Sequence, residues 1–365
     1  MERKIDDIVS VLKAAKRSNR RCSLLIGAGC SVSAGIPLAS QFVEIIKDQY
    51  PSAYGRAETK TYPHCMYELE PGIRRDLIAR YIDQAKINWA HIVIAQLVKH
   101  GYVDRVLTPN FDPLVMRACA LAGEFPAVYD FAASQQFNPA YVSAKAIFHL
   151  HGQRDGFNLL HTDEEVNALT DALTPVFDDA GKGRMWLVVG YSGDNDPVFK
   201  HLARVKEFDF GLYWVTYRDD EPAAHVQSGL LQKNKGAFYV KGYDADEFFV
   251  KLARELDCFP PDLIARPFSH LDSLLKMLTP YDLRISSTEA ESDAWATTRT
   301  FVEAAIHRYE KPTTGLDDDG LNADKEQEEA RRQVLATEQA LLAADYIGVV
   351  QRLFHKPTEQ NPPAA

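Results

Sequence analysis

The sequence is poor in the residues that build disulfide frameworks and metal clusters. Only 5 of its 365 residues are cysteine, and no two of them form a Cys-x-x-Cys pair. Scattered cysteines of this kind argue against a disulfide framework and against a zinc ribbon. They are typical of a protein that works in a reducing cytoplasm, which is the compartment we expect.

The chain also lacks a basic surplus and a long apolar run. Its net charge is −10 at pH 7, and no basic stripe runs along it. We therefore do not expect sequence-specific nucleic-acid binding by this chain alone. The first 21 residues are charged and amphipathic, unlike a secretory signal. No apolar run is long enough to cross a bilayer, so no membrane association is expected.

The most informative stretch is residues 24–37, Leu-Leu-Ile-Gly-Ala-Gly-Cys-Ser-Val-Ser-Ala-Gly-Ile-Pro. Its apolar start predicts a buried strand, and Gly27 and Gly29 predict a sharp turn that a ligand can approach closely. A helix N-terminus behind such a turn would cradle an anion, for which a dinucleotide pyrophosphate is the natural candidate. The spacing departs from the usual dinucleotide fingerprint, because Val32 stands where the third glycine belongs and the next glycine is Gly35.

Strand-like runs alternate with helical patterns over residues 20–257. The predicted strands are residues 22–26, 103–107, 127–129, 145–150, 185–189, 212–216 and 237–240. This alternation is typical of a doubly wound, Rossmann-like parallel sheet of the α/β class. Polar or glycine-rich motifs follow directly after four of the strands. Because the carboxyl ends of parallel strands meet at one edge, the sequence predicts a single site there.

The motif Thr108-Pro109-Asn110-Phe111-Asp112 supplies an amide and a carboxylate directly after a strand. One interpretation is a turn that caps the helix beginning near Pro113. The other gives Asn110 the task of orienting a water or a ribose hydroxyl. Asp112 would then accept a hydrogen bond from a neutral amide such as that of nicotinamide.

Two histidines, His149 and His151, lie two positions apart at the end of a strand and so point to the same face. No third ligand lies nearby at a spacing that would predict a metal site. His149 lies inside the strand and is expected to be buried. His151 stands at the strand tip, and since imidazole titrates near neutral pH it is the candidate general base.

The motif Gly190-Tyr191-Ser192 offers small residues and backbone amides for contact with a phosphate or a ribose. An ordinary turn between strand and helix is the alternative. Cys30, inside the glycine loop, is expected to pack rather than react. Ser31 and Ser33 do not lie in a Gly-x-Ser-x-Gly elbow, so serine-hydrolase chemistry is not supported.

Beyond residue 258 the character of the chain changes. Phe259-Pro260-Pro261 is a natural stop, and no strand-like run follows it. The expected elements there are helices over residues 263–278 and 327–354, a mobile loop at 311–324 and a disordered tail at 356–365. We therefore predict an α/β domain of residues 1–258 and a C-terminal helical appendage of residues 259–365.

The order of these motifs resembles that of the sirtuin (SIR2) family, and the matching segments cover roughly residues 22–257. They are, in order, Gly27-Ala28-Gly29-Cys30-Ser31, Gly35-Ile36-Pro37, Asn88-Trp89-Ala90-His91, Thr108-Pro109-Asn110-Phe111-Asp112, His151-Gly152 and Gly190-Tyr191-Ser192. The last three are similar to the family's Thr-Gln-Asn-Ile-Asp, catalytic His-Gly and Gly-Thr-Ser motifs.

The departures from the family pattern are informative. Lysine deacylases of the family carry a four-cysteine zinc module after the His-Gly pair, whereas residues 153–184 contain no cysteine. No zinc site is therefore expected. Leu38-Ala39-Ser40 replaces the usual Asp-Phe-Arg, and Pro109 replaces a glutamine. These changes put protein deacylation in doubt and resemble the SIR2-like effectors of bacterial antiphage systems, which hydrolyse NAD⁺.

The resemblance implies an NAD⁺ glycohydrolase that takes NAD⁺ as substrate and needs no cofactor. It implies that residues 1–258 bind and cleave NAD⁺, and that residues 259–365 serve assembly or partner binding. Homo-oligomers and a companion such as a HerA-type ATPase are expected. The implied site residues are the catalytic Asn110 and His151; Gly27, Ala28, Gly29 and Ser31 at the pyrophosphate; Ile36 and Asp112 at nicotinamide; and Gly190, Ser192, Tyr217 and Tyr243 along the adenosine half. A non-catalytic sensor of NAD or ADP-ribose and a zinc-free deacylase remain the alternatives.

Overall fold

The computed structural model describes residues 1–134, 136–156, 158–168, 170–194, 196–279 and 294–310. The chain divides into two compact units, Met1–Pro261 and Asp262–Ala365, which are described separately below. The predicted helix at 327–354, the loop at 311–324 and the tail at 356–365 lie outside the described residues.

The first unit is built on a seven-stranded sheet with the strand order β3-β4-β2-β1-β5-β6-β7. All six pairings are parallel. The strands are β1 Cys22–Ile26, β2 Val103–Thr108, β3 Ala127–Asp130, β4 Ala146–His149, β5 Met185–Val189, β6 Leu212–Tyr217 and β7 Ala237–Tyr243. The chain builds one side of the sheet from β1 and then returns to β1 to build the other side with β5. The predicted doubly wound α/β fold is confirmed, and the crevice between β1 and β5 is its topological switch point.

Helices cover both faces of the sheet, because successive residues of a strand point to opposite sides. In β1, Leu24 and Ile26 are buried in one core and Leu25 in the other. The first core receives α1 Ile5–Arg17, α6 Trp89–Lys99, α7 Leu114–Leu121 and α12 Ala245–Glu255. The second receives α9 Thr170–Gly181, α10 Pro197–Arg204 and α11 Ala224–Gly229. Burial on both faces explains why β5 is apolar throughout and why Ser23 is the one polar residue of β1.

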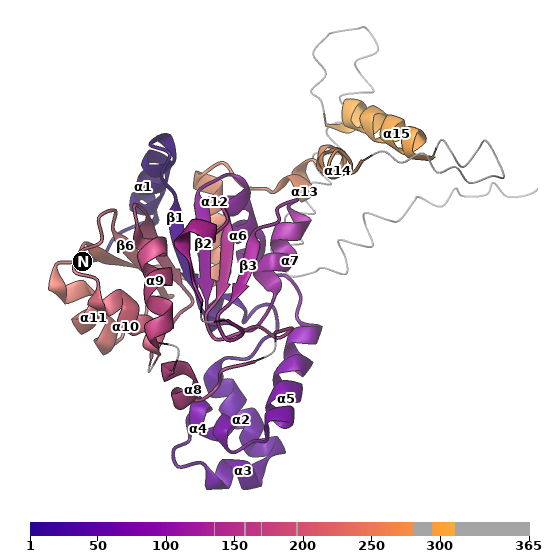
Figure 1. Cartoon of the computed structure of the whole chain (residues 1–365). Helices are drawn as coiled ribbons and strands as arrows, with labels where there is room; N and C mark the ends of the chain where they lie inside the picture. Colours follow the sequence, from indigo (N-terminus) through magenta and orange to yellow (C-terminus); the bar gives the residue numbers. More distant parts are fainter. Residues whose placement is uncertain (135, 157, 169, 195, 280–293, 311–365) are drawn as a thin grey trace, which may run out of the picture. The chain divides into compact units, whose positions relative to one another are not determined.

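A helical module of residues 39–84 is inserted between β1 and β2. Figure 1 shows it as a group of helices beyond the carboxyl ends of the strands. Its helices are α2 Ala39–Gln49, α3 Pro51–Arg56, α4 Tyr62–Tyr67 and α5 Pro71–Gln84. The sequence predicts an irregular segment at residues 50–72, and this prediction is wrong. Pro51, Pro63 and Pro71 stand in the first turns of their helices, where the missing N–H group leaves no intrahelical bond unmade.

The break expected near Asn88 is confirmed. Asn88 is the N-cap of α6, and its side chain accepts a hydrogen bond from the backbone N–H of His91. Helices α8 Asp163–Asn167 and α9 had no counterpart in the sequence pattern. Pro175 stands inside α9, so the local sequence argues against a helix that packing against the sheet nevertheless stabilises.

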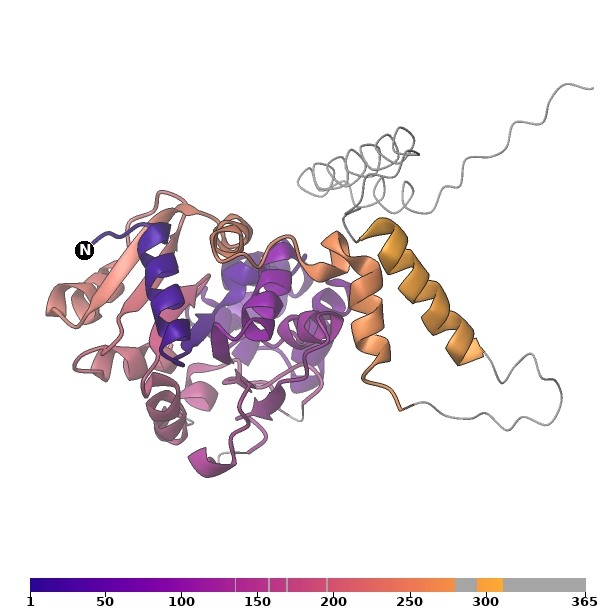
Figure 2. The same ribbon diagram turned by 90° about the horizontal axis from the view of Figure 1, so that it is seen from above.

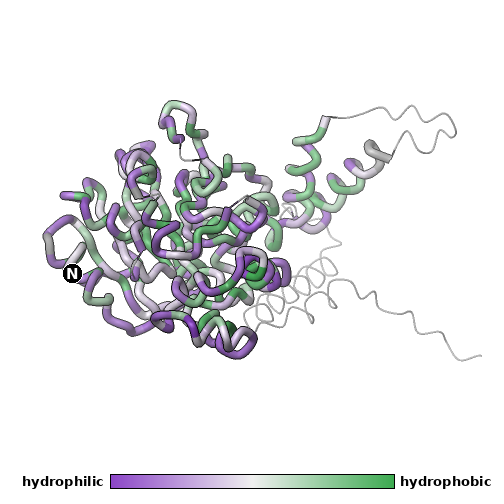
Figure 3. The backbone as a smooth tube through the Cα atoms, turned by 60° about the horizontal axis from the view of Figure 1, so that its bottom comes forward, coloured by the Kyte–Doolittle hydropathy of each residue, from purple (hydrophilic) through white to green (hydrophobic). Residues whose placement is uncertain are grey.

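The second unit contains α13 Asp262–Ala265, α14 Pro267–Leu275 and α15 Ala294–Tyr309. Figures 1 and 2 show α14 and α15 side by side, and the rings of Phe268 and Tyr309 stack between them. The Glu310 carboxylate accepts hydrogen bonds from the N–H groups of Phe268 and Ser269 and so caps α14. Figure 3 colours hydrophobic segments in both helices. The helix predicted at 263–278 is confirmed, with a break at Arg266.

None of the helices in the described part of the chain combines the length and the apolar character that a membrane span requires.

His161 joins the helical module to the segment that follows β4. Its ring Nδ1 lies 2.9 Å from the Tyr62 hydroxyl of α4, and its ring packs edge-on against Phe111. Glu165 accepts the backbone N–H of His161 at 2.8 Å. Burial lowers the pKa of His161 from 6.5 to about 4, since the charged imidazolium would lose its hydration there. The contact therefore depends on a neutral ring.

We predict that this contact makes stability pH-dependent. In the unfolded chain His161 is protonated as the pH falls below 6.5. In the folded protein its lowered pKa of about 4 keeps the ring neutral to a lower pH. The wild-type protein should lose about 2 kcal/mol of unfolding free energy between pH 6.5 and 5 through this group. His161→Gln should remove that part of the loss in urea titrations at the two pH values. Parallel losses in the two proteins would contradict the assignment.

Candidate functional site

Three glycines bring the loops after β1 and β5 into direct backbone contact. A Cβ atom on Gly27 would lie 2.5 Å from the carbonyl oxygen of Gly190, and one on Gly29 would lie 2.8 Å from the Cα of Gly190. Gly190 itself has φ +63°, and a Cβ there would lie 2.6 Å from the backbone nitrogen of Cys30. We call this contact the glycine junction. Gly27 and Gly29 are therefore required for packing between two loops, a reason that the sequence pattern did not reveal.

The strand-turn-helix cradle predicted after β1 is not formed as expected. The chain after Gly27 makes one 3₁₀ turn, η1 Ala28–Cys30, and the next α-helix begins only at Ala39. The amides of Gly29, Cys30 and Ser31 donate to the carbonyls of Gly190, Gly27 and Ala28 at 2.8, 3.0 and 2.9 Å. These small residues turn back on the loop after β5 instead of propagating a helix, so no helix N-terminus completes the expected anion cradle at this turn.

Asn110 is held firmly beside the glycine junction. Its side-chain Nδ2 donates to the Gly27 carbonyl at 3.1 Å and to the Ser31 hydroxyl at 3.3 Å. Its backbone carbonyl accepts from Nδ1 of His149 at 3.0 Å. Both amide hydrogens are thus engaged, and no residue in the described ranges donates to Oδ1. The side chain can therefore present an acceptor to a water or a hydroxyl group without moving.

Asp112 is only 5% exposed and is bonded on both of its carboxylate oxygens. Oδ1 accepts the N–H of Leu114 at 3.1 Å, at the start of α7. Oδ2 accepts the hydroxyl of Ser31 at 2.9 Å. The helix-capping interpretation of this residue is confirmed. Its contact with Ser31 also ties the motif after β2 to the glycine junction, while binding of nicotinamide stays a prediction.

His91, expected to be structural, lies behind Asp112 in the core. Its Nδ1 is hydrogen-bonded to Asn88, and its Nε2 lies 4.0 Å from Asp112 Oδ1. Burial lowers the pKa of His91, which outweighs the attraction of the nearby carboxylates. The His91 ring is fully buried and packs on the core side of Asp112.

The two histidines at the end of β4 have different surroundings, as expected. His149 is 2% exposed, and burial lowers its pKa. The His151 side chain retains 12% exposure, and its Nε2 lies 3.4 Å from Oδ1 of Asp196. The segment that carries His151 runs beside Asn110, since Leu150 N–H donates to Thr108 and Arg154 N–H donates to Phe111. Both predicted catalytic residues thus sit on neighbouring strand ends.

Asp196 is the residue that sequence reasoning missed. It lies in the loop after β5 and is the N-cap of α10, accepting the N–H of Val198 at 2.9 Å. An aspartate directly before a proline is a typical helix start. Because Asp196 follows β5, this signal indicates a position at the carboxyl edge of the sheet. No pattern in the sequence indicates the 3.4 Å contact between Asp196 and His151, because the two residues lie far apart along the chain.

Three further predicted residues, Ser192, Tyr217 and Tyr243, lie at or after the ends of β5, β6 and β7. Ser192 is exposed, and its carbonyl accepts from Nε2 of His225 at 2.9 Å. Tyr217 and Tyr243 are paired in register at the ends of β6 and β7. Tyr217 is 59% exposed, and the Tyr243 hydroxyl accepts from the Lys251 ammonium group. Within the described ranges, no contact joins either tyrosine to Asn110 or His151, so their placement along the adenosine half stays a prediction.

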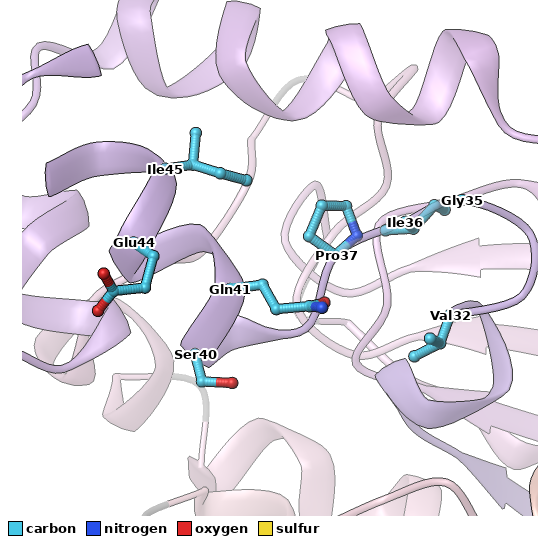
Figure 4. A pocket seen from close by; sticks show the side chains of 8 residues that line it. All are labelled: Val32, Gly35, Ile36, Pro37, Ser40, Gln41, Glu44 and Ile45. Carbon is cyan, nitrogen blue, oxygen red and sulfur yellow. The ribbon is translucent and has the colours of Figure 1, made fainter. Parts of the chain in front are cut away.

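A cavity of about 600 Å³ opens between the loop after η1 and the start of α2. Figure 4 shows the side chains that line it: Val32, Gly35, Ile36, Pro37, Ser40, Gln41, Glu44 and Ile45. Of the predicted site residues, Ile36 alone belongs to this lining, and its N–H donates to the carbonyl of Ser31 at 3.2 Å. The cavity therefore adjoins the glycine junction through the Ser31–Ile36 bond.

All five cysteines are free and buried. Burial raises the pKa of the Cys30 thiol far above neutral pH, so this thiol stays protonated and packs in the loop. Among the described residues, no three histidine, cysteine, aspartate or glutamate side chains are placed to hold a metal ion.

Comparison with known proteins identifies part of this region. Residues 104–239 match the family model of the SIR2-like domain. The matched segment runs from β2 into β7 and contains Asn110, His151 and Asp196, whereas the loop after β1 precedes it. No curated protein in the comparison matches the chain.

Several solved Sir2 structures are similar to this chain. One is a Sir2 homologue in complex with NAD, at 16% identity and a TM-score of 0.46, covering 70% of this chain and 95% of its own. Another is a Sir2 enzyme bound to a propionylated peptide, at 19% identity and a TM-score of 0.39, covering 70% of this chain and 100% of its own.

We predict that Gly29→Ala destabilises the protein by disrupting the glycine junction. The new methyl group would overlap the backbone of Gly190, which should lower the unfolding free energy by about 1–3 kcal/mol. Gly55→Ala in α3 is the matched control, since a Cβ there meets nothing within 4 Å. That change should leave stability equal or higher by up to about 1 kcal/mol. Urea titration measures both, and equal effects would refute the packing role.

Proposed function

We propose that this chain is an NAD⁺ glycohydrolase, which releases nicotinamide and ADP-ribose. The observation that carries the proposal is the fixed Asn110 amide. Its two hydrogens are bound by Gly27 and Ser31, and no described residue donates to its Oδ1. The backbone on either side of Asn110 is bonded to the segment that carries His151. The match of residues 104–239 to the SIR2-like domain supports this placement of the chemistry.

The reaction needs a positioned water more than a strong acid. The bond between ribose C1′ and the pyridinium nitrogen breaks, and its electron pair returns to that nitrogen to give neutral nicotinamide. The water oxygen bonds to C1′ and gives up one proton. Because the cationic ring is already a good leaving group, holding the water and the ribose in place supplies most of the rate. In the proposal Asn110 orients the water and His151 takes the proton from water or from a ribose hydroxyl.

The binding roles follow the strand ends. The pyrophosphate lies over Gly27–Ser31, and the adenosine half runs past Gly190 and Ser192 toward Tyr217 and Tyr243. Because three amides of the loop are bonded to carbonyls, pyrophosphate binding on this surface relies on other donors or on a change in the loop.

Nicotinamide lies in this proposal near Asp112 and the backbone at Ile36. Ile36 lines the 600 Å³ cavity, and Asp112 shares Ser31 as a hydrogen-bond partner with Asn110. The two ends of this short network would hold the nicotinamide amide on one side and the attacking water on the other.

We further propose that activity is conditional and that the protein is an effector of bacterial antiphage defence by NAD⁺ depletion in the cytoplasm. An unregulated NAD⁺ hydrolase would kill its own cell. Residues 259–365 are then the region through which the chain forms homo-oligomers or binds a companion such as a HerA-type ATPase. NAD⁺ is substrate here, and no zinc takes part in the proposal.

The turnover test is direct. Full-length protein, with and without its companion, is incubated with NAD⁺, and released nicotinamide is measured by chromatography. Asn110→Ala and His151→Ala should each lower kcat by about 10²–10⁴-fold. His100→Ala, at the opposite end of β2, should leave kcat unchanged. Binding of NAD⁺ without release of nicotinamide would indicate the sensor, and NAD⁺-dependent cleavage of an acyl-lysine peptide would indicate the deacylase.

The assembly role has its own test. A chain ending at residue 261 should lose the oligomeric state of the full-length protein in light-scattering mass measurements. An unchanged number of subunits would place the assembly surface in the first unit.

A further inference from the structure

The strongest unexplained contact joins His151 to the loop after β5. The Oδ1 atom of Asp196 accepts the Val198 N–H at 2.9 Å, which fixes the carboxylate at the start of α10. The same oxygen lies 3.4 Å from Nε2 of His151, and the two side chains are 14% and 12% exposed. Two strands, β2 and β1, separate β4 from β5 in the sheet, so this contact spans the carboxyl edge above them.

The chemistry of the contact selects one form of the imidazole ring. His151 Nε2 is buried, and no hydrogen bond to it is formed in the described part of the chain. A carboxylate accepts hydrogen bonds and cannot donate them, so the nitrogen that faces it is favoured to carry the proton. At 3.4 Å the contact is longer than an ordinary hydrogen bond, and it becomes an ion pair only when the ring is protonated. Contacts of this kind commonly shorten when substrate binds.

We propose that Asp196 is a positioning residue, which holds His151 with its Nε2 proton toward the carboxylate and leaves Nδ1 as the atom that accepts the reaction's proton. This inference rests on the proposed function and deepens it, because it names the basic atom and the group that orients it.

The carboxylate is suited to this role because it stays ionised. Burial alone would raise the pKa of Asp196, but attraction to His151, together with hydrogen bonds to the carboxylate, holds that pKa below its ordinary value. Tyr191 is the other titratable group that faces Asp196. Burial, reinforced by the Asp196 charge, raises the pKa of the Tyr191 hydroxyl, so it remains neutral. On the other side, His161 is the titratable neighbour that interacts with the His151 ring.

The pair also accounts for the charge that forms during the reaction. When Nδ1 accepts the proton, His151 becomes a cation with a proton on each nitrogen. Its Nε2 proton then faces a negative carboxylate in a mostly buried setting, where an opposite charge stabilises the cation more than it would in water. The proton leaves again to solvent after ADP-ribose forms, so the pair returns to its starting state.

A purely structural role as the cap of α10 can be separated from this one by the choice of variant. Asparagine is as good an N-cap as aspartate, so Asp196→Asn keeps the bond to Val198 and removes the charge. Asp196→Ala removes both. Asp209→Asn is the matched charge control, since Asp209 is exposed and lies just before β6, at the opposite edge of the sheet.

Kinetics of NAD⁺ hydrolysis by the full-length variants test the proposal, with the companion present if activity requires it. Asp196→Asn should lower kcat by about 10- to 100-fold with little change in KM or Tm. Asp196→Ala should lose at least as much kcat and also lower Tm. Asp209→Asn should match the wild-type protein. A wild-type kcat in Asp196→Asn, or a loss that appears only in KM or Tm, would overturn the positioning role.

A second measurement does not depend on turnover. In protein labelled with ¹³C at the aspartate carboxyl groups, the Asp196 signal is assigned by its loss in Asp196→Asn. Its titration should move to higher pH in His151→Gln, because the attraction to His151 is gone. An unchanged titration would overturn the pair. If the titration shifts while wild-type protein leaves NAD⁺ intact, the pair stands and the proposed hydrolase function fails.

Discussion

The loops after β1 and β5 approach so closely that no side chain fits between them, and the rest of the site depends on this contact. Gly29 donates its N–H to Gly190, and each glycine occupies space that a Cβ on the other would need. The contact places the Gly27 carbonyl and the Ser31 hydroxyl where Asn110 can bind both. Backbone packing at the switch point of the sheet thus sets the positions of side chains that come from a different strand.

The polar groups at this edge are bonded mainly to one another. Ser31 bridges Asn110 and Asp112, and His149 holds the backbone of Asn110 from the next strand. Groups that are oriented before a ligand arrives need little rearrangement when charge develops on it. The same arrangement stabilises the fold, because buried polar atoms that lack partners are costly. The hydrogen bonds of Ser31, Asn110 and Asp112 therefore serve both the stability of the fold and the proposed chemistry.

The sequence predicted the sheet well and the site in part, for physical reasons that differ between them. Strands such as β1 and β5 are buried on both faces, so their composition alone identifies them. Asn110 and His151 were predictable because they follow strands directly. The partner of His151 was not, since Asp196 meets it only through the crossing of loops after β4 and β5.

Other features depended on tertiary contacts that the sequence does not display. The close approach of Gly27 and Gly29 to Gly190 is a property of two strands paired in space. The sequence does not identify helices α3 and α4, because proline in a first turn marks a helix start as readily as a break. Helices form there because α3 and α4 contribute to a hydrophobic core that also includes Phe42, Ile46 and Leu77.

The helical module between β1 and β2 has a hydrophobic core separate from the two that flank the sheet. An insertion with its own core can open and close as a cooperative unit while the sheet stays folded. The cavity beside Ile36 is lined by the loop and the first helix of this module. Amide hydrogens in α2–α5 should therefore exchange with solvent through smaller openings than those of β1 and β5, and such openings would reshape the cavity while the sheet stays folded.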